Sequence, residues 1–589
     1  MTRETKRVLA AFAGLFVIVV LAGLGLRLAG EGKLVSPTVL EVDLQHGFPE
    51  APEDDPVAKL ISEERLTLRD LIATLDYAGR DKAVRGLVAR VDTSGIGMAQ
   101  AQEIRDAIGR FRARKKFAYA FSETFGEASN GNVAYYLATG FEEIWLQPSG
   151  DVGLNGLFLQ SPFIRGTLDK LGLKPEFGKR HEYKSAADFY TETKFTEAHR
   201  EANERLKDSW FSQIVRGIAA GRKLPEAEVR ALAERGPLLG REALKARLVD
   251  GLAYRDEVFD KAKKRGGKDS KLLYLSRYRD RTGKKEKGRH KLALVYAVGG
   301  IIRGESNEGS LMGPLLGSET LGDALREASE DDDVEAIILR VDCPGGSYIA
   351  SDTVWRETVL AKENGKPVIV SMGDVAASGG YFVSMAADKI VAQPGTITGS
   401  IGVLYGKMVA TGLLDKLGIS FDGVRTGEHA DMYAITQEFS PSEWARVNAF
   451  LDRIYEDFTS KVAAGRKLPR QKVLEIAKGR VWTGEDAKAL GLVDELGGLE
   501  TAVKLARRSA NIPDGESVRL QVFPEPRSLT ESLWDKLLGR GEEKSSDREA
   551  AARLLVQTVR ALRPLIRELG LVDTRGVLSM PPGEGWRQR

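Results

Sequence analysis

Two glycine-rich turns and one serine are the parts of this sequence best suited to nucleophilic chemistry. Ser378 stands in the run Ala377-Ser378-Gly379-Gly380, after the apolar segment 367–372 and before an apolar helical stretch. Ser378 therefore sits where a helix begins, with the Gly379 N–H and the positive end of the helix dipole available to developing negative charge. A second turn, Pro344-Gly345-Gly346, also follows an apolar run, and its adjacent glycines leave backbone N–H groups open to a cavity. The two turns together could hold an oxyanion beside a serine nucleophile.

Each of these motifs also has a purely structural interpretation. Gly345-Gly346 could be a tight turn, and Ser378 could cap the helix that follows it. Cys343, just before the glycines, is expected to be a small buried residue and not a nucleophile. The sequence has no G-x-S-x-G elbow, which argues against an α/β-hydrolase.

A serine nucleophile needs a base, and there are two candidates: a lysine that only a family resemblance singles out, and a histidine. Lys184 lies in Tyr183-Lys184-Ser185-Ala186, and His429 lies nearer to the serine in the chain. A lysine with its ordinary pKa of about 10.4 is almost fully protonated at pH 7, so it must be desolvated to act as a base. Burial can lower its pKa by roughly 3 to 5 units. His429 would give a serine–histidine pair, although Asp431 is too close in sequence to orient the ring.

Charged neighbours of Lys184 are expected to affect its pKa. Lys179, Arg180 and His181 should push the pKa down, whereas Glu182 opposes them. The local sequence is therefore compatible with a lysine base but does not require one.

These candidates lie in two copies of one repeated unit. The heptapeptide Ala-Ala-Gly-Arg-Lys-Leu-Pro occurs at 219–225 and at 463–469, a separation of 244, and Leu-Val-Asp recurs from 248 to 492 with the same separation. Arg-Val-Asp recurs from 90 to 340, a separation of 250, and the segment 135–148 matches 381–394 at 246. Small loop insertions explain the drift between these values, so the chain contains a tandem duplication.

The duplication relates the two candidate catalytic residues. Adding 246 to Lys184 gives Ala430, and subtracting 246 from Ser378 gives Asn132. If Ser378 is the nucleophile and Lys184 its base, each copy keeps one half of the pair and has lost the other half.

The elements that must position these residues alternate between strands and helices. In the second copy, the apolar runs 292–298, 336–341 and 368–370 are predicted strands, and 351–362 is a predicted helix. This βαβ pattern predicts an α/β fold with a largely parallel sheet in each copy. The charged segment 279–291 is the predicted linker between the copies. We divide the chain into residues 1–30, the first copy at 31–285, the second copy at 286–524, and a charged, partly helical tail at 525–589 that includes the helix-like segment 550–569.

The composition excludes some classes of function. A chain of 589 residues with a formal charge of +3 needs at least two domains and has no basic excess for binding nucleic acid. The single cysteine cannot form an intrachain disulfide, and the five histidines form no metal-binding motif. We therefore expect no metal and no nucleic-acid partner.

The N-terminus is predicted to be a membrane anchor. Arg3, Lys6 and Arg7 precede an uncharged, mostly apolar run at 8–26, which is about long enough to cross a bilayer as a helix. Arg27 stands where cleavage would need a small residue, which favours an uncleaved anchor over a signal peptide. The flanking charges also argue against a buried core helix. The basic flank should stay cytoplasmic and place the rest of the chain across the membrane.

Three motifs carry a resemblance to a known family. Pro344-Gly345-Gly346, Ala377-Ser378-Gly379-Gly380-Tyr381 and Thr398-Gly399-Ser400-Ile401-Gly402 resemble the signal peptide peptidase A (protease IV) family of the ClpP/crotonase-like superfamily. The resemblance runs from the anchor to about residue 520 and matches the long, duplicated form. It implies a tandem ClpP/crotonase-like fold preceded by one transmembrane helix.

The resemblance assigns a role to each candidate residue. It implies that Ser378 is the nucleophile and that Lys184, in the family's Tyr-Lys-Ser-Ala motif, is the general base and acid. Ser400 corresponds to the serine that orients the lysine, and Gly346 and Gly379 to the oxyanion-hole donors. No cofactor is implied.

The resemblance also implies substrates and an assembly. The expected substrates are hydrophobic peptides, including signal peptides left in the membrane after cleavage. The expected assembly is a bowl-shaped homotetramer, in the bacterial inner membrane with the catalytic body on the periplasmic side. In the family's long form the dyads are completed between neighbouring protomers, and this sequence leaves open which protomer supplies Lys184. Two alternatives stay open: a crotonase-like acyl-CoA enzyme, which needs neither Ser378 nor Lys184, and an inactive membrane scaffold.

Overall fold

The computed structural model describes six stretches of the chain, residues 37–52, 66–92, 95–127, 129–282, 288–307 and 314–525. The predicted membrane span at 8–26 and the helix-like segment at 550–569 lie outside these residues. Within the described stretches, no helix has the length and apolar character needed to cross a bilayer. Apart from residues 51, 52 and 525, the described residues belong to one compact unit that contains both copies.

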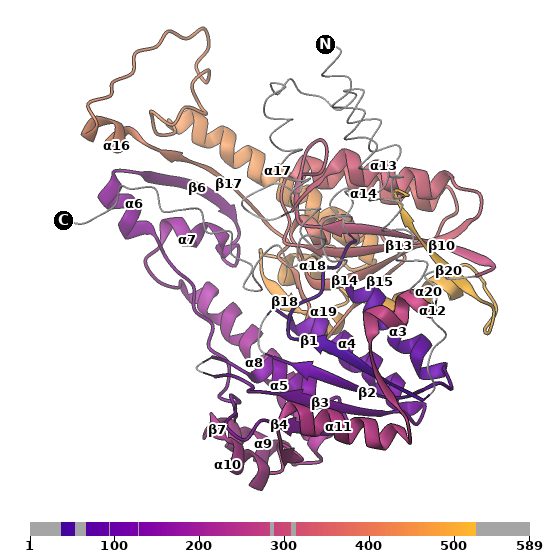
Figure 1. The fold of residues 1–589 in the computed structure, drawn as a ribbon. Helices are drawn as coiled ribbons and strands as arrows, with labels where there is room; N and C mark the ends of the chain where they lie inside the picture. The colour runs from indigo at the N-terminus through magenta and orange to yellow at the C-terminus, as the bar shows by residue number, and fades with distance from the viewer. Residues whose placement is uncertain are drawn as a thin grey trace, which may run out of the picture. The chain divides into compact units, whose positions relative to one another are not determined.

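The first copy is built on a sheet of six parallel strands (Figure 1). The strand order is β8-β4-β3-β2-β1-β9. The strands are β1 (Thr38–Leu44), β2 (Val84–Val91), β3 (Phe117–Ser122), β4 (Glu143–Leu146), β8 (Gly251–Leu252) and β9 (Lys271–Tyr274).

The second copy repeats this order with the equivalent strands β19-β15-β14-β13-β10-β20, again all parallel. The strands are β10 (His290–Val298), β13 (Val334–Cys343), β14 (Val368–Ala377), β15 (Lys389–Ala392), β19 (Glu495–Leu496) and β20 (Val518–Phe523). The predicted tandem duplication of an α/β unit is confirmed. The observed strands are longer than the apolar runs from which they were predicted.

Short strands differ between the copies. In the second copy, β16 (Ile397–Gly399) pairs with the end of β14 and with β18 (Val481–Thr483). In the first copy, the equivalents β5 (Asp151–Val152) and β7 (Leu238–Leu239) pair only with each other in a separate sheet. A further small sheet joins β11 (Gly300–Ile302) to β12 (Leu315–Gly317).

Helices cover both faces of each sheet. In the first copy, α3, α4, α5, α8 and α9 pack on one face and α11 on the other; in the second, α13, α14, α15, α17 and α18 face α20 across the sheet. The first-copy helices are α3 (Leu68–Arg80), α4 (Met98–Ala113), α5 (Asn132–Ala138), α8 (Glu197–Arg222), α9 (Glu226–Ala233), α10 (Gly240–Lys245), α11 (Arg255–Gly266) and α12 (Leu275–Thr282). The second-copy helices are α13 (Ser318–Glu330), α14 (Tyr348–Glu363), α15 (Gly379–Ser384), α17 (Pro441–Arg466), α18 (Arg470–Ile476), α19 (Gly484–Ala489) and α20 (Leu499–Ser509).

The predicted linker at 279–291 is shorter than expected. Helix α12 continues to Thr282 and β10 already begins at His290. Residues 283–287 lie outside the described stretches.

The repeated heptapeptide ends the longest helix of each copy. Helices α8 and α17 both have 26 residues, and each is followed by a lysine in the left-handed conformation, Lys223 or Lys467. The glycine of the heptapeptide lets the helix approach its neighbour closely. A Cβ at Gly221 would lie 2.2 Å from the Thr139 carbonyl, and a Cβ at Gly465 would lie 2.3 Å from the Met385 carbonyl. The same glycine therefore packs each long helix against the end of α5 or α15.

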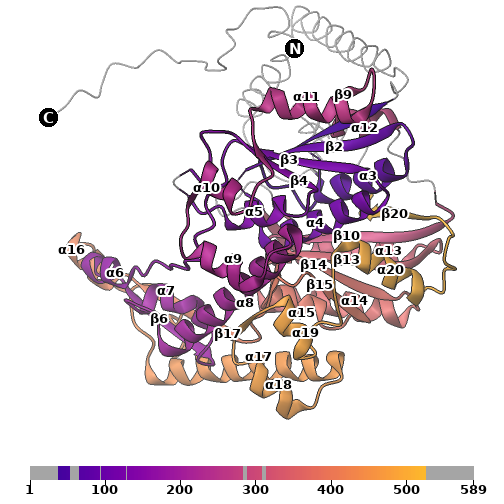
Figure 2. The same cartoon turned by 90° about the horizontal axis from the view of Figure 1, so that it is seen from below.

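One pair of strands joins the two copies. Strand β6 (Lys174–Arg180) of the first copy follows the short helix α6 (Arg165–Leu171) and pairs antiparallel with β17 (Val403–Val409) of the second copy (Figure 1). Helix α17 runs along both strands, as Figure 2 shows. After β17 the second copy has the short helix α16 (Thr411–Lys416), whereas β6 leads to a 3-10 turn (Ser185–Ala187) and α7 (Asp188–Thr191).

Candidate active site

Ser378 lies where β14 ends and α15 begins, at the carboxyl end of the second sheet. Its backbone has φ 54° and ψ −114°, a strained combination for a residue with a Cβ. The Ser378 N–H donates to the Gly399 carbonyl at 2.9 Å. The side chain makes no capping hydrogen bond to α15. Ser378 therefore occupies the N-cap position of α15 without capping the helix through its side chain.

The glycine turn beside Ser378 has no room for side chains. Gly345 and Gly346 have φ values of 111° and 156°. A Cβ at Gly345 would lie 2.8 Å from the Ser378 Cβ, and a Cβ at Gly346 would lie 2.1 Å from the Ile301 carbonyl. The Ile301 N–H donates to the Gly345 carbonyl at 2.9 Å, which fixes the turn against β11. Glycine is required at both positions by the backbone and by the close contacts.

The two predicted oxyanion donors are neighbours. A Cβ at Gly379 would lie 3.1 Å from the Gly346 nitrogen, and a Cβ at Gly345 would lie 2.8 Å from the Gly379 nitrogen. Among the described residues, we find no hydrogen bond donated by either the Gly346 or the Gly379 N–H. Two free N–H groups beside a serine can stabilise negative charge that develops on a carbonyl oxygen.

Lys184 reaches Ser378 from the first copy. Its Nζ lies 3.0 Å from the Ser378 Oγ, 2.9 Å from the Ser400 Oγ and 2.9 Å from the Ser400 carbonyl oxygen. The side chain is only 6% exposed. Burial lowers the pKa of the Lys184 amine from 10.5 to about 8, because the charged form loses its hydration. Roughly a tenth of the amine is then neutral at pH 7, against a few parts in ten thousand for an ordinary lysine.

The charged neighbours of Lys184 do not act as the sequence predicted, since burial is the cause of its lowered pKa. These neighbours have partners of their own. The contacts are Lys179 with Asp188 at 2.6 Å, Arg180 with Asp452 at 2.6 Å, Glu182 with Lys478 at 3.0 Å, and the His181 ring against Tyr455. Ion pairing neutralises the nearby charges, so desolvation is left as the main influence on the Lys184 amine.

The pairing of β6 with β17 explains how Lys184 reaches its place. Arg180 at the end of β6 is opposite Val403 at the start of β17. Because the strands are antiparallel, the chain leaving β6 lies beside the chain that enters β17. Lys184 follows β6 by four residues and Ser400 precedes β17 by three. The strand register therefore brings the lysine against the serine.

Gly479 supports the backbone of Lys184, a role that the sequence analysis missed. A Cβ at Gly479 would lie 2.6 Å from both the nitrogen and the Cβ of Lys184, and the glycine has φ 83°. Its N–H donates to the Ile401 carbonyl at 2.8 Å, so the loop is wedged between Lys184 and the segment that carries Ser400. Comparison of the two copies could have indicated this role, because the first copy has Arg235 at the position of Gly479, at the separation of 244.

Ser400 is held by its backbone in the left-handed region, at φ 52°. Its N–H donates to the Arg480 carbonyl at 2.7 Å. Strand β16, which ends at Gly399, pairs with the last residues of β14 before Ser378. Ser400 and Ser378 are therefore anchored to the same strand pair.

The other sequence candidates lie elsewhere. The His429 ring contacts Ser442 at 3.2 Å and lies 3.8 Å from Glu428, whereas the described partner of the Ser378 hydroxyl is Lys184. Cys343 is fully buried, and burial raises the pKa of its thiol to about 12. No three His, Cys, Asp or Glu side chains of the described stretches gather as a metal site would require.

The corresponding positions of the first copy lack these groups. Asn132 replaces the serine, is fully buried, and donates to the Gly156 carbonyl at 2.7 Å. At the same separation of 246, Leu154 stands where the second copy has Ser400. Ala430 replaces the lysine and lies in an exposed stretch.

Ser378 and Lys184 come from the same chain. The sequence left open whether Lys184 and Ser378 meet within one protomer or between neighbours, and the contact of 3.0 Å forms within one chain. The physical reason is the pairing of β6 with β17, which links the two copies of one chain directly.

A serine hydroxyl in contact with a buried amine, beside two free backbone N–H groups, has the parts of an acyl-transfer site. The chain matches the model of peptidase family S49 in two segments, residues 122–269 and 360–513, one in each copy. It is 32% identical to the chloroplastic serine protease SPPA of Arabidopsis thaliana over 89% of this chain and 75% of that protein. It is 31% identical to Protease 4 of Salmonella typhi, over 81% and 78% of the two chains, and 33% identical to Protease 4 of Haemophilus influenzae, over 76% and 74%.

The chain therefore belongs to peptidase family S49 and is a serine protease of the long, duplicated signal peptide peptidase A type. Among solved structures, a ClpP1 mutant from Listeria monocytogenes aligns with 36% of this chain and 94% of its own, with 16% identity and a TM-score of 0.23. The ClpP/crotonase-like assignment of the fold therefore stays a prediction.

Proposed function

We propose that the chain is a membrane-anchored endopeptidase that uses Ser378 as nucleophile and Lys184 as general base to degrade hydrophobic peptides, such as cleaved signal peptides. The observation that carries the proposal is the contact of 3.0 Å between the Lys184 amine and the Ser378 hydroxyl. The lowered pKa of the buried amine supports its use as a base near neutral pH.

The proposed reaction begins with neutral Lys184. Its Nζ takes the Ser378 proton while Oγ forms a bond to the peptide carbonyl carbon. The electron pair of the carbonyl moves to its oxygen, which accepts hydrogen bonds from the Gly346 and Gly379 N–H groups. The protonated lysine then gives its proton to the peptide nitrogen as the C–N bond breaks. This leaves an acyl ester on Ser378 and a free amine product.

Water completes the cycle. Lys184, neutral again, takes a proton from water as the oxygen attacks the ester carbon. The tetrahedral intermediate uses the same two N–H groups, and the proton returns to the Ser378 oxygen when the ester bond breaks. In both half-reactions Ser400 offers two oxygens, each 2.9 Å from Nζ, which directs the amine toward Ser378.

Labelling with a fluorophosphonate tests this proposal. We expect a covalent adduct in the wild-type protein, no adduct in Ser378→Ala, and a loss of rate of about 10²- to 10⁴-fold in Lys184→Ala. Lys478→Ala is the matched control, because this lysine is close by but pairs with Glu182, and it should label at the wild-type rate. An acyl-CoA enzyme or a scaffold would give no adduct that depends on Ser378. A wild-type rate in Lys184→Ala would refute the base assignment.

A cavity beside the dyad, lined in part by apolar side chains, supports hydrophobic substrates. A cavity of about 340 Å³ adjoins Lys184 and Ser400, and Pro162, Phe163 and Phe189 line part of it. Such a surface favours apolar side chains over charged ones. We expect a higher kcat/KM for peptides with leucine or phenylalanine near the cleaved bond than for matched peptides with aspartate. Equal values would contradict this part of the proposal.

The proposed anchor rests on the sequence. The apolar run at 8–26 and the basic residues before it support a single-pass helix in the bacterial inner membrane, with the catalytic body on the periplasmic side. We expect the full chain to stay in the membrane fraction after an alkaline carbonate wash and a variant without residues 1–30 to be released. Release of the full chain would refute the anchor.

We also propose that the chain forms a head-to-tail homotetramer, in which the number four comes from the family resemblance. The pairing of β6 with β17 within one chain supports an equivalent pairing between the first copy of one protomer and the second copy of the next. At the separation of 246, β6 corresponds to about residues 420–426 and β17 to about 157–163. These two segments are in no described strand, and their side chains include the exposed Phe421, Val424 and Phe158.

A second copy of the chain fits these exposed segments, because pairing 420–426 of one protomer with 157–163 of the next would repeat the β6–β17 contact. Val424→Pro should block this pairing. Gly427→Pro, just outside the segment, is the control. We expect light scattering to report a smaller assembly only for the first variant. A monomeric wild-type protein would refute the proposal.

A further inference from the structure

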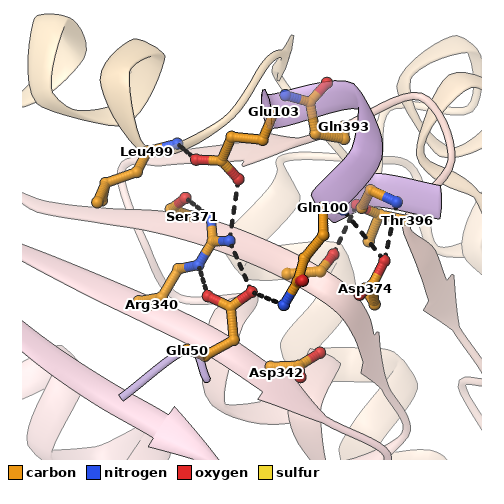
Figure 3. A network of polar contacts seen from close by, with 12 residues as sticks. Glu50, Gln100, Glu103, Arg340, Asp342, Ser371, Asp374, Gln393, Thr396 and Leu499 are labelled. Carbon is orange, nitrogen blue, oxygen red and sulfur yellow. Dashed lines mark hydrogen bonds and ion pairs between the residues drawn. The ribbon is translucent and has the colours of Figure 1, made fainter. Parts of the chain in front are cut away.

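The first copy also contacts the second through a buried network that surrounds Arg340 on β13 (Figure 3). This side chain is 2% exposed, and its guanidinium donates to Glu50 at 2.8 Å and to Glu103 on α4 at 3.0 Å. It also donates to the Ser371 hydroxyl on β14 at 2.8 Å. Two carboxylates of the first copy and one guanidinium of the second therefore fix where α4 lies on the second sheet.

Asp374, further along β14, contacts the start of the same helix. One carboxylate oxygen accepts the Ala99 N–H at 2.8 Å and the Gln100 N–H at 3.3 Å, in the first turn of α4 (Figure 3). The residue at the N-cap of α4 is Gly97, which has no side chain to do this. A Cβ at Gly97 would lie 2.1 Å from a carboxylate oxygen of Asp374. The cap of this helix therefore comes from the other copy.

The repeat shows that this arrangement is specialised. At the separation of 250, Gly97 corresponds to Ser347, which caps the equivalent helix α14 with its own hydroxyl. Serine is a preferred N-cap, and glycine is a weaker one. The first copy thus has glycine where its counterpart has a cap, and the space is filled by Asp374.

Asp374 lies in a bulge that precedes the nucleophile. Val341 pairs with Met372 and Cys343 pairs with Ala376, so Asp342 alone faces residues 373–375 of β14. The Asp342 carboxylate accepts the Val375 N–H at 2.9 Å. A bulge redirects the strand that follows it, and Ser378 comes four residues after Asp374.

We infer that Asp374 is a positioning residue: by capping α4 of the first copy, it holds the bulge of β14 in the shape that directs the Ser378 hydroxyl toward Lys184. The inference rests on the proposed role of Ser378 as nucleophile. The first copy then contributes to catalysis twice, once through its lysine and once through the start of α4.

The charges around Asp374 make this contact sensitive to pH. Burial, and then the negative charge of Asp342, raise the pKa of the Asp374 carboxyl to about 6, and Glu50 adds to this effect. The N–H groups of α4 lower it, and Arg340 and Glu103 belong to the adjoining network. Above pH 6 the carboxylate is charged and interacts favourably with the helix N-terminus. Below pH 6 it becomes neutral and the cap weakens.

Two variants test the inference from opposite sides of the contact. Asp374→Asn keeps the shape of the side chain but removes its charge. Gly97→Ser gives the first copy the serine of the second copy, so α4 keeps a cap while the new Cβ displaces Asp374. Asp106→Asn is the matched control, because Asp106 lies on the same helix and contacts Gln393 at 3.1 Å, away from the bulge.

The measurements are the rate of fluorophosphonate labelling, kcat and KM for a peptide substrate, and the melting temperature. We expect Asp374→Asn and Gly97→Ser each to lower the labelling rate and kcat by about 10- to 100-fold, the effect of a small misplacement of a reacting group, with KM within about twofold. The double variant should lose little more than either single one, because both act on one contact. Asp106→Asn should label at the wild-type rate.

The pH profile of the wild-type protein is a second test that needs no variant. Its labelling rate should fall more steeply below pH 6 than between pH 6 and 8, and this extra fall should be absent in Asp374→Asn. Wild-type rates in both variants, or a profile with no steeper part below pH 6, would overturn the inference. Absence of labelling of wild-type Ser378 would instead refute the proposed function itself.

Discussion

The reactivity of Ser378 should follow the ionisation of Lys184 as the pH is changed. The buried amine has a pKa of about 8 in place of 10.5. Only the neutral amine can take the serine proton, so the rate should rise about tenfold per pH unit up to pH 8 and then level off. At pH 7 the lowered pKa makes the neutral amine roughly 300 times more abundant than in an exposed lysine.

The assay is the pseudo-first-order rate of fluorophosphonate labelling from pH 5 to pH 10, in the wild-type protein and in Lys184→Ala. Labelling reports the chemical step at Ser378 without a contribution from product release. The wild-type rate should show a midpoint near pH 8, and the rise should disappear in the variant. A midpoint near 10, or the same rise in Lys184→Ala, would refute the argument that burial activates this lysine. Lys179→Ala is the control, because Lys179 is paired with Asp188.

Four further results are expected. Gly479→Ala should lower kcat by about 100-fold because the new Cβ meets the Lys184 backbone, whereas Gly427→Ala, which has open space, should have no effect in the same peptide assay. Ser400→Ala should slow labelling by about five- to tenfold through the loss of one hydrogen bond to the amine, and a wild-type rate would contradict its orienting role. The folded chain binds a proton at Lys184 less tightly than the unfolded chain does, so protonation of this lysine destabilises the fold. Lys184→Met should therefore raise the free energy of unfolding at pH 7, measured with urea, by up to about 3 kcal/mol. This gain should disappear as the pH rises from 8 to 10.5. Arg340→Met should destabilise the fold by about 3 to 5 kcal/mol, because it leaves two buried carboxylates without their partner, and urea unfolding that matches the wild type would count against this.

The sequence predicted the duplicated fold because repeated sequence implies repeated structure. The separation between copies of the heptapeptide equals that between α8 and α17, which begin at Glu197 and Pro441. The strands of the second copy were predicted from buried apolar runs, and they were placed correctly but too short. The parts that were missed contain polar residues such as Asp342 and Asp374, which interrupt the apolar pattern.

The family resemblance assigned Ser378 and Lys184 as nucleophile and base, and the repeat added that each copy retains only one of the two. The sequence could not predict what surrounds Lys184. The nearby cations were expected to lower its pKa, but they do so only if no acidic side chain neutralises them. The partner of Arg180 is Asp452, which is far away in the chain and could not be predicted from the local sequence. The roles of Gly479 and Asp374 were missed for a similar reason: both depend on contacts between the two copies, which neither copy contains alone.

The pairing of β6 with β17 has a consequence for the time at which the chain becomes active. During synthesis the first copy emerges with a lysine and no serine nucleophile, and Ser378 emerges before β17 does. On the proposed mechanism, no hydrolysis can occur until residue 409 has been added and β17 has paired with β6. On this mechanism a chain that stops before residue 409 is inert, because the pairing of β17 with β6 brings Lys184 to Ser378.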